Sequence, residues 1–289
     1  MPIYKPSELH QFLEGLGVHP KKGLSQNFLI DGNILRKIAT TAQVETGDTV
    51  LEIGPGPGSL TEELLARGAH VIAVEKDPVF AGALSRLNPP ETAVSRLTIH
   101  CDDIMAFPVE AALTPLLQQG KKAKVIANLP YHLTTPIIAL LIEQYRLFST
   151  LVLMVQEEVA RRFVAPPKTK DYSSFTVFLN FYSKPHYAFT VNRQCFYPSP
   201  QVDSAIVVLE LQEPPPVTDR EAFFKLTRTA FQHRRKMLRS SLKGLYSSEN
   251  VEAALQQMEK SPLARPEDLS LEDFLKLFSH LHHSETVKK

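Results

Sequence analysis

The amino-acid sequence predicts an α/β fold, in which a doubly wound, largely parallel sheet is followed by a small, all-helical C-terminal domain. As far as residue 156, short apolar runs alternate with amphipathic stretches, which is typical of parallel strands joined by crossover helices. Beyond the stiff, proline-rich segment at residues 213–216, helical periodicity continues without strand signals. We therefore expect two domains, at residues 1–212 and 213–289.

The predicted elements follow the apolar pattern. Strands are expected at residues 49–53, 70–75, 97–101, 123–127 and 151–156, with helices between them, for example at residues 59–67 and 134–145. Residues 187–191 and 205–211 are expected to form an antiparallel pair at the edge of the sheet. In the second domain we expect helices at residues 219–245, 249–259 and 271–281.

Composition narrows the class of protein. The chain has 289 residues, of which 43% are hydrophobic and 22% are charged, an ordinary balance for a globular protein. No apolar run is long enough to cross a membrane, and the N-terminus lacks the basic head and apolar core of a signal peptide. Cys101 and Cys195 belong to no metal-binding motif. We expect a cytoplasmic protein with no metal and no membrane partner.

The distribution of charge is more informative than its sum. The net charge is only +1, but basic clusters occur at residues 21–22, 121–122, 161–162 and 233–239. A single cluster is usually a solvated helix face. Four clusters in a balanced chain favour a polyanionic partner.

A glycine loop follows the first predicted strand. Gly54, Gly56 and Gly58 stand between that strand and a helix, where glycine permits a tight turn and the close approach of a ligand. Glu75 ends the next strand, where its carboxylate can accept both hydroxyls of a ribose. The pattern predicts a nucleoside cofactor, and both NAD and S-adenosylmethionine (SAM) carry a ribose.

The spacing of the loop favours SAM. Dinucleotide loops follow the pattern G-x-G-x-x-G, whereas these glycines follow G-x-G-x-G with Pro55 and Pro57 between them. The prolines lack the N–H groups that a pyrophosphate needs, and SAM has no phosphate. Asp102 and Asp103 close the third strand, where either can accept a hydrogen bond from an adenine amino group. The alternative role is a helix cap, which we favour for Asp102.

The fourth strand ends in the corner Asn128-Leu-Pro-Tyr131. An adenine amino group is a poor nucleophile toward a sulfonium methyl group, because its lone pair is delocalised into the ring. The Asn128 amide oxygen and the Leu129 carbonyl, held by Pro130, can accept its two hydrogens, while Tyr131 stacks on the unstacked base. The corner therefore predicts a clamp for a nucleobase amine. The alternative is a strand terminator with a packed tyrosine.

Seven segments in this order resemble the bacterial ribosomal RNA small-subunit (16S) adenine N6-dimethyltransferases, which are related to the eukaryotic dimethyladenosine transferases. The segments are KKGLSQNFLID, LEIGPGPGSLTEEL, VEKDP, NLPYHLTTPI, MVQEEVARR, FYPSPQVDSAIV and FQHRRKMLRSSL. The resemblance implies a Rossmann-like SAM-dependent methyltransferase domain and a helical RNA-binding domain. It also implies N6,N6-dimethylation of two adjacent adenines in a hairpin loop near the 3′ end of 16S rRNA, in an assembling small ribosomal subunit. We expect the chain to act as a monomer.

The resemblance also implies particular site residues. Tyr131 and Phe196 would hold the target adenine between them, completing a catalytic set with Asn128, Leu129 and Pro130. The implied SAM-binding residues are Asn27, Leu29, Gly54, Glu75, Asp103 and Asn128.

The sequence departs from the family pattern at three positions. Ser25 stands where glycine is frequent, Lys76 where an apolar residue is common, and His132 where asparagine is common. None of the three is an implied site residue. Lys76 is the departure with an electrostatic consequence, because a cation near a sulfonium is unfavourable unless it points away.

The basic segment at residues 233–239 is expected to contact RNA. On a predicted helix, Arg235 and Arg239 lie one turn apart on a shared face, with Arg234 and Lys236 around them. Phosphate contacts supply affinity and position without reading sequence. The alternative is an exposed helix whose charges only confer solubility.

Other functions stay open at this point. The 23S rRNA adenine N6-methyltransferases that confer antibiotic resistance share the NLPY corner, although the PSPQVDS segment and the basic C-terminal extension favour the small-subunit type. A ribosome-assembly factor that acts mainly by binding is a second alternative, against which the intact Glu75, Asn128 and Tyr131 argue. An NAD oxidoreductase is disfavoured, since no hydride-transfer constellation is present.

Overall fold

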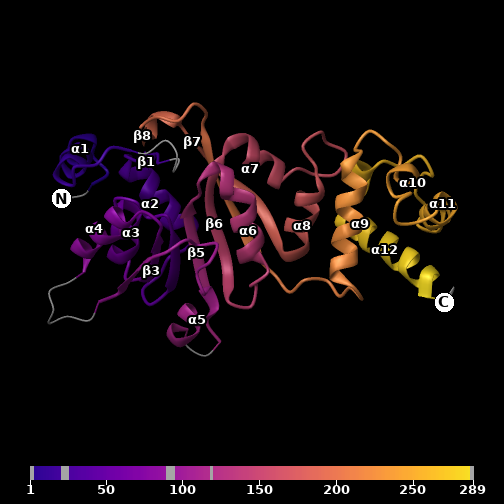
Figure 1. Ribbon diagram of the computed structural model, residues 1–289, viewed down its shortest axis with the longest axis horizontal. Coiled ribbons are helices and arrows are strands. Elements are labelled where there is room, and N and C mark those ends of the chain that lie inside the picture. Colours follow the sequence, from indigo (N-terminus) through magenta and orange to yellow (C-terminus); the bar gives the residue numbers. More distant parts are fainter. Residues whose placement is uncertain (1–2, 21–25, 89–94, 118–119, 287–289) are drawn as a thin grey trace. The chain divides into compact units, whose positions relative to one another are not determined.

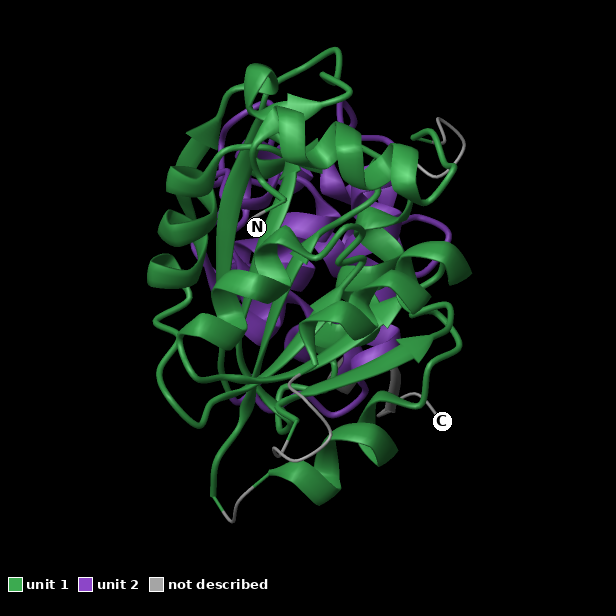
Figure 2. Ribbon diagram, turned by 90° about the vertical axis from the view of Figure 1, so that its left-hand side faces the viewer, with its two compact units in different colours: residues 1–160, 186–212 green, residues 161–185, 213–289 purple. Residues whose placement is uncertain are grey.

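The computed structural model describes residues 3–20, 26–88, 95–117 and 120–286. The chain forms two compact units, which Figure 2 shows in different colours. Unit 1 comprises residues 1–160 and 186–212, and unit 2 comprises residues 161–185 and 213–289. The chain enters unit 2 twice, at residue 161 and again at residue 213, and the second entry coincides with the predicted domain boundary. Residues 161–185, which we expected in the first domain, group with unit 2 instead.

Unit 1 is built around a mixed sheet (Figure 1). Among the described residues, seven strands form it in the order β4, β3, β2, β5, β6, β9, β7. The strands from β4 to β6 in this order are parallel, and β9 is antiparallel to β6. The predicted parallel strands are confirmed, and β7 is an edge strand. The bounds are β2 Thr49–Ile53, β3 His70–Glu75, β4 Leu97–Cys101, β5 Ala123–Asn128, β6 Phe148–Gln156, β7 Ser183–Val191 and β9 Ser204–Leu211.

Parallel pairing brings four strand ends to one edge of this sheet. Ile53 at the end of β2 pairs with Val74 of β3 and with Ala127 of β5. Glu75 at the end of β3 pairs with Cys101 at the end of β4. The segments that follow these strands therefore lie side by side at the carboxyl edge, where ligands of such sheets bind.

The helices of unit 1 alternate with these strands. They are α1 Pro6–Gly15, α2 Gly32–Thr41, α3 Ser59–Ala66, α4 Pro78–Ala83, α5 Val109–Leu113 and α6 Thr134–Ile142, while α7 Glu157–Phe163 spans the passage into unit 2. The start of α2 is fixed by Asp31, whose carboxylate accepts a hydrogen bond from the Asn33 N–H at 2.8 Å.

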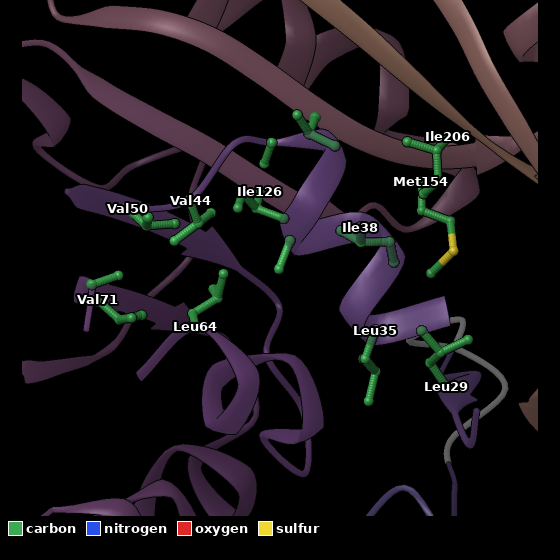
Figure 3. Close-up of a cluster of buried hydrophobic side chains, with 14 of the residues drawn as sticks. Leu29, Leu35, Ile38, Val44, Val50, Leu64, Val71, Ile126, Met154 and Ile206 are labelled. Atoms are coloured by element: carbon green, nitrogen blue, oxygen red, sulfur yellow. The ribbon is translucent and has the colours of Figure 1, made fainter. Parts of the chain in front are cut away.

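One face of the sheet packs against α2 and α3. Leu35 and Ile38 of α2 and Leu64 of α3 form a buried cluster with strand residues that include Val50 of β2 (Figure 3). Removing this apolar surface from water stabilises the arrangement. Because side chains alternate along a strand, Glu52 lies on the same face as Val50.

Unit 2 consists mainly of helices. Their bounds are α8 Ser174–Tyr182, α9 Arg220–Gln232, α10 Leu238–Ser241, α11 Ser248–Gln257 and α12 Leu271–Thr286. In the described part of the chain, no helix is both long enough and apolar enough to cross a membrane.

Aromatic packing explains why residues 161–185 belong to unit 2. The ring of Phe178 in α8 lies 5.1 Å from that of Phe224 in α9, and the ring of Phe181 lies 5.5 Å from that of Phe223, measured between centroids. Such pairs bury large apolar surfaces in preferred geometries. The strand pattern of the sequence gives no sign of this pairing, because the two helices are separated by β7 and β9.

The predicted continuous helix at residues 219–245 is wrong. α9 ends at Gln232, residues 233–237 form a turn, and α10 begins at Leu238. The Leu238 N–H donates to the Ala264 carbonyl oxygen at 2.9 Å, a partner outside the helix. No glycine or proline marks the break, so helical periodicity alone does not reveal it.

Candidate active site at the carboxyl edge of the sheet

The glycine loop at residues 54–58 adopts backbone conformations that require glycine. The angle φ is +65° at Gly54, +53° at Gly56 and +90° at Gly58, all in the left-handed region. A Cβ atom on Gly56 would also lie only 3.1 Å from the Phe28 ring. The three glycines are therefore needed for the path of the chain between β2 and α3.

The loop uses its own N–H groups internally. The Gly54 N–H donates to a β3 carbonyl at 2.9 Å, and the Gly58 N–H donates to the Pro55 carbonyl at 3.0 Å. The Gly56 N–H donates to Glu75 Oε2 at 2.9 Å, and both prolines of the loop lack an N–H. No N–H group between residues 54 and 58 is left for a pyrophosphate, which agrees with a cofactor that carries none.

Glu75 is buried, and backbone donors orient its carboxylate. Oε2 accepts from Gly56, and Oε1 accepts from the Asp77 N–H at 2.8 Å. Burial raises the pKa of Glu75, and these two hydrogen bonds oppose the rise. A carboxylate oxygen can accept more than one hydrogen bond. The oriented Glu75 carboxylate is therefore suited to accept hydrogen bonds from the hydroxyls of a ribose.

A second acid, Glu52 of β2, is buried under the glycine loop. It is 1% exposed, and its Oε2 has no hydrogen-bond partner among the described residues. Burial raises the pKa of Glu52 to about 8; the nearby Thr61 hydroxyl opposes this rise and the Glu75 carboxylate adds to it. Glu52 is therefore a neutral carboxylic acid at pH 7.

The turn after β4 holds Asp103 in a defined position. Asp103 Oδ2 accepts from Lys76 Nζ at 2.8 Å, and Oδ1 accepts from the Met105 N–H at 2.9 Å. The hydrogen bond from Lys76 is the main reason that the pKa of Asp103 lies below its usual value. Asp102 accepts from the Asp103 N–H at 2.7 Å, so it stabilises this turn and does not cap a helix, contrary to our expectation.

At the corner where β5 ends, hydrogen bonds fix the Asn128 amide and the Leu129 backbone. Asn128 Nδ2 donates to the Asn27 carbonyl oxygen at 3.2 Å. A carbonyl can only accept, so the amide is oriented with Oδ1 as its remaining acceptor. The Leu129 side chain is buried, and its N–H donates to the Met154 carbonyl at 3.2 Å, which anchors the corner to β6. Pro130, at φ −62°, then turns the chain away from the strand.

Tyr131 follows this corner and is half-buried. Its hydroxyl lies 3.3 Å from Ser204 Oγ at the start of β9, and Ser204 is itself buried. The ring is thus held at both ends, by the backbone at Pro130 and by the hydroxyl contact. Such a ring can offer a face to a base.

Two adjoining cavities lie at this edge and share Asn27, Phe28, Ile53, Gly54 and Asn128 in their walls. The first cavity brings together the sequence-predicted residues Asn27, Gly54, Glu75, Asp103, Asn128, Leu129, Pro130 and Tyr131. The second cavity is bordered by further residues that include Leu29, Glu52 and Met154.

Among the predicted catalytic and cofactor-binding residues, Phe196 is the one that lines neither cavity. It is 3% exposed and belongs to the core cluster that α2 covers. It forms the two-residue strand β8, Phe196–Tyr197, which pairs with β1, Phe28–Leu29, in the register Leu29 to Phe196. In this arrangement its ring packs in the core, so its role as the second face for adenine stays a prediction.

The four cations of the basic segment that were predicted to contact RNA fall into two groups, two in ion pairs and two exposed. Arg234 Nε pairs with Glu267 Oε2 at 2.7 Å, and Arg239 pairs with Glu252. Arg235 and Lys236 are exposed. Because the segment turns between α9 and α10, the shared helical face predicted for Arg235 and Arg239 does not exist. The basic residues Lys21 and Lys22, and the departure Ser25, lie outside the described residues.

Sequence reasoning missed two features of this site. One is Glu52, although a single acid inside the apolar run TVLEI was a visible signal. The other is the Ser204 contact with Tyr131. It depends on the pairing of β9 with β6, and the sequence around either residue does not indicate it.

The acceptor groups at this edge fit a purine nucleoside. Glu75 suits a ribose, Asp103 suits an amino group of a purine, and the neutral Glu52 lies beside the shared wall at Gly54. Among the described residues, no three His, Cys, Asp or Glu side chains are placed to hold a metal ion.

The chain matches a family model and curated relatives over nearly its whole length. Residues 18–283 match the family model described as "Ribosomal RNA adenine dimethylase". The chain is 62% identical over 285 residues to "Ribosomal RNA small subunit methyltransferase A" of Protochlamydia amoebophila (strain UWE25), covering 99% of each chain. It is 47% identical to the protein of the same name from Chlamydia felis (strain Fe/C-56), covering 96% of this chain and 95% of the relative.

Two solved structures are similar over most of the chain. The dimethyladenosine transferase of Plasmodium falciparum has a TM-score of 0.73 at 27% identity, covering 89% of this chain and 98% of that one. The 23S rRNA methyltransferase ErmE has a TM-score of 0.67 at 27% identity, covering 89% of this chain and 100% of that one. With the family model matching most of its length, this chain belongs to the ribosomal RNA adenine dimethylase family.

Proposed function

We propose that this chain transfers methyl groups from SAM to the N6 atoms of two adjacent adenines in a hairpin loop near the 3′ end of 16S rRNA. Membership of the family and the small-subunit name of its full-length relatives support this activity. The same names do not favour the large-subunit alternative or a factor that acts by binding alone. The observation that carries the chemistry is the orientation of Asn128, whose amide nitrogen is occupied by Asn27.

SAM, when bound, supplies a methyl group activated as a sulfonium. The proposed binding residues are Glu75 for the ribose, Asp103 for the adenine amino group, and Asn27, Leu29, Gly54 and Asn128 for the rest. The internally bonded glycine loop supports SAM over a dinucleotide. An NAD site would need N–H donors that this loop does not offer.

The proposed role of the corner is to prepare the target amine. Asn128 Oδ1 and the Leu129 carbonyl each accept one hydrogen of the amino group, which draws the nitrogen toward tetrahedral geometry and frees its lone pair. Pro130 fixes the Leu129 carbonyl, and Tyr131 stacks on the base. The transferred methyl group would leave the sulfur of SAM, which becomes a neutral thioether, and the nitrogen that gains it would carry the positive charge and become acidic. Its proton can then leave to water or to a clamp oxygen, and no strong base is required.

The proposed partner is 16S rRNA within an assembling small ribosomal subunit, and we propose that the chain acts there as a monomer in the cytoplasm. Arg235 and Lys236 of unit 2 are exposed cations suited to phosphate contacts. A pocket that grips one adenine cannot select it from a ribosomal RNA, so phosphate contacts outside the pocket must position the enzyme.

Mass spectrometry of digested rRNA tests this function. Small subunits that lack the modification and, in a parallel reaction, large subunits are incubated with isotopically labelled SAM and the purified chain, and the nucleosides of 16S and 23S rRNA are analysed separately. We expect labelled N6,N6-dimethyladenosine in 16S rRNA, at two residues per molecule. Label in 23S rRNA alone, or no label with tight subunit binding, would contradict the proposal.

The cofactor assignment has its own test. Replacing Glu75 by Ala removes the proposed ribose acceptor, and we expect SAM affinity to fall at least tenfold, about 1.5–3 kcal/mol for a charge-assisted hydrogen bond. Calorimetry on the folded variant measures this. Unchanged SAM affinity would remove Glu75 from the site, and tighter binding of NAD than of SAM would overturn the cofactor.

A further inference from the structure

Lys76 is a cation in the wall of a cavity proposed to bind a cationic cosubstrate. It follows Glu75 directly, and its side chain is 61% exposed, against 34% for its partner Asp103. Both residues line the first cavity. The other titratable groups in that wall are Glu75, Asp102, Tyr131 and His132.

The Lys76 ammonium forms an ion pair with Asp103. The distance from Nζ to Asp103 Oδ2 is 2.8 Å, so the pair carries no net charge and does not repel a sulfonium as a lone cation would. The unfavourable electrostatics expected from this departure are therefore cancelled within the pair.

The pair also fixes the carboxylate. The Met105 N–H holds Oδ1 at 2.9 Å, and Lys76 holds Oδ2. With both oxygens held, the plane of the carboxylate is set by two hydrogen bonds, one from the residue after β3 and one from the turn after β4. Each oxygen keeps one further lone pair for a ligand donor. Charge-assisted acceptors of this kind make the stronger hydrogen bonds.

We propose that Lys76 is a positioning residue, which orients the Asp103 carboxylate to accept the exocyclic amino group of the cosubstrate's purine. This inference rests on the proposed SAM site. It predicts that the contribution of Lys76 to affinity depends on two other groups, the Asp103 carboxylate and the amino group of the ligand.

The test uses S-adenosylhomocysteine and its purine-riboside analogue, which has hydrogen in place of the amino group. Binding is measured by calorimetry for the full-length wild type, Lys76→Met, Lys76→Arg, Asp103→Ala and the double variant Lys76→Met/Asp103→Ala. Lys121→Met is the matched control, because Lys121 is an exposed lysine that precedes β5 and lines neither cavity.

We expect Lys76→Met to weaken S-adenosylhomocysteine binding about two- to fivefold at low salt, the size typical of a partly exposed ion pair, and less at high salt. Lys76→Arg should restore affinity, since a guanidinium also donates to a carboxylate. The effect of Lys76→Met should vanish for the purine-riboside analogue and in the Asp103→Ala background. Lys121→Met should bind as the wild type does.

The outcomes separate this inference from the function on which it rests. A wild type that does not bind S-adenosylhomocysteine would overturn the SAM site itself. Normal wild-type binding with no effect of Lys76→Met would overturn the positioning role alone. An equal loss for both ligands, or a loss that persists in the Asp103→Ala background, would also overturn it, because Lys76 would then act on something other than the amino-group contact.

Discussion

The carboxyl edge of the unit 1 sheet and the basic segment at residues 233–239 of unit 2 were both predicted from short motifs, with different results. At the sheet edge, motifs up to about one hundred residues apart meet in one cavity, as the Asn27–Asn128 hydrogen bond shows. In the basic segment, two of the four predicted cations are already bound within unit 2. A motif at the end of a parallel strand is placed by the sheet, whereas a cluster of charges on a supposed helix depends on that helix being continuous.

The difference has a physical origin in backbone hydrogen bonding. Strand pairing fixes the register of β2, β3, β4 and β5, and so the position of everything that follows them. The Arg234 side chain instead bridges a carboxylate and two backbone carbonyls, pairing with Glu267 and donating to Thr169 and Lys170. The Arg234 guanidinium therefore stabilises unit 2, and it would have to leave these partners to contact a phosphate.

The largest expected effect concerns Phe196, the one catalytic residue predicted for the sheet edge that the structure places in the core. Phe196→Ala should lower the free energy of unfolding by about 3–5 kcal/mol, the usual result of a large cavity in a core. Phe196→Leu, which keeps most of the volume, should cost less than about 1.5 kcal/mol. Urea denaturation of both variants measures this. A Phe196→Ala variant of normal stability that has lost methylation would instead favour direct contact with the base.

Asn128→Ala tests the sheet edge at its reacting centre. Removing an oriented polar group there should reduce the single-turnover rate about 10²–10³-fold. Affinity for SAM and RNA should fall much less, because Asn128 mainly orients the amine. Asn33→Ala, an exposed position at the start of α2, serves as the control. A variant that keeps its rate, or one that fails chiefly in SAM binding, would remove Asn128 from its proposed role in orienting the target amine.

The glycine loop, its carboxylates and the NLPY corner could be predicted because each is local in sequence and each follows a strand of clear pattern. Three features were not predicted, although the acid within TVLEI was a visible hint of the first. The raised pKa of Glu52 depends on burial within the folded sheet, and the Ser204 contact with Tyr131 depends on strand order. The break after Gln232 depends on a tertiary bond from Leu238 to Ala264. Each depends on partners distant in sequence.

Glu52 offers a test of how the sheet edge tolerates a buried acid. Its pKa is 4.5 as an ordinary glutamate and about 8 in the fold. Below pH 4.5 both states hold the proton. As pH rises toward 8, the unfolded state releases it first, so stability should fall, by about 2–3 kcal/mol between pH 5 and pH 7 from this group.

Glu52→Gln keeps a neutral side chain of similar size, so its stability should lack this component of the pH dependence. Denaturant unfolding at pH 5, 6 and 7 compares the variant with the wild type. The advantage of the variant should grow as pH rises. A constant difference across this range would mean that Glu52 is ionised in the folded protein.

The smallest expected effect on the protein concerns the basic segment, and it tests most directly how that segment differs from the sheet edge. Arg235 and Lys236 are exposed, while Arg234 and Arg239 pair with acids. Reversing Arg235 and Lys236 to Glu should leave unfolding unchanged and weaken binding to an assembling small subunit. If each cation contacts one phosphate, each loss should flatten the slope of log affinity against log salt by about 0.9, or somewhat less on single-stranded RNA.

The two paired arginines provide the matched control. Arg234→Glu and Arg239→Glu place a second acid beside Glu267 and Glu252, so their main effect should be on the stability of unit 2, by about 1 kcal/mol or more once like charges replace a partly buried pair. At temperatures where these variants stay folded, the salt dependence of subunit binding should keep its wild-type slope. Reversal of Arg234 or Arg239 could instead flatten that slope as strongly as reversal of Arg235 and Lys236. That result would mean that the two arginines leave Glu267 and Glu252 and contact RNA when the subunit binds. The division of the segment into structural and binding cations would then be wrong, and the whole segment would bind RNA as its sequence predicts.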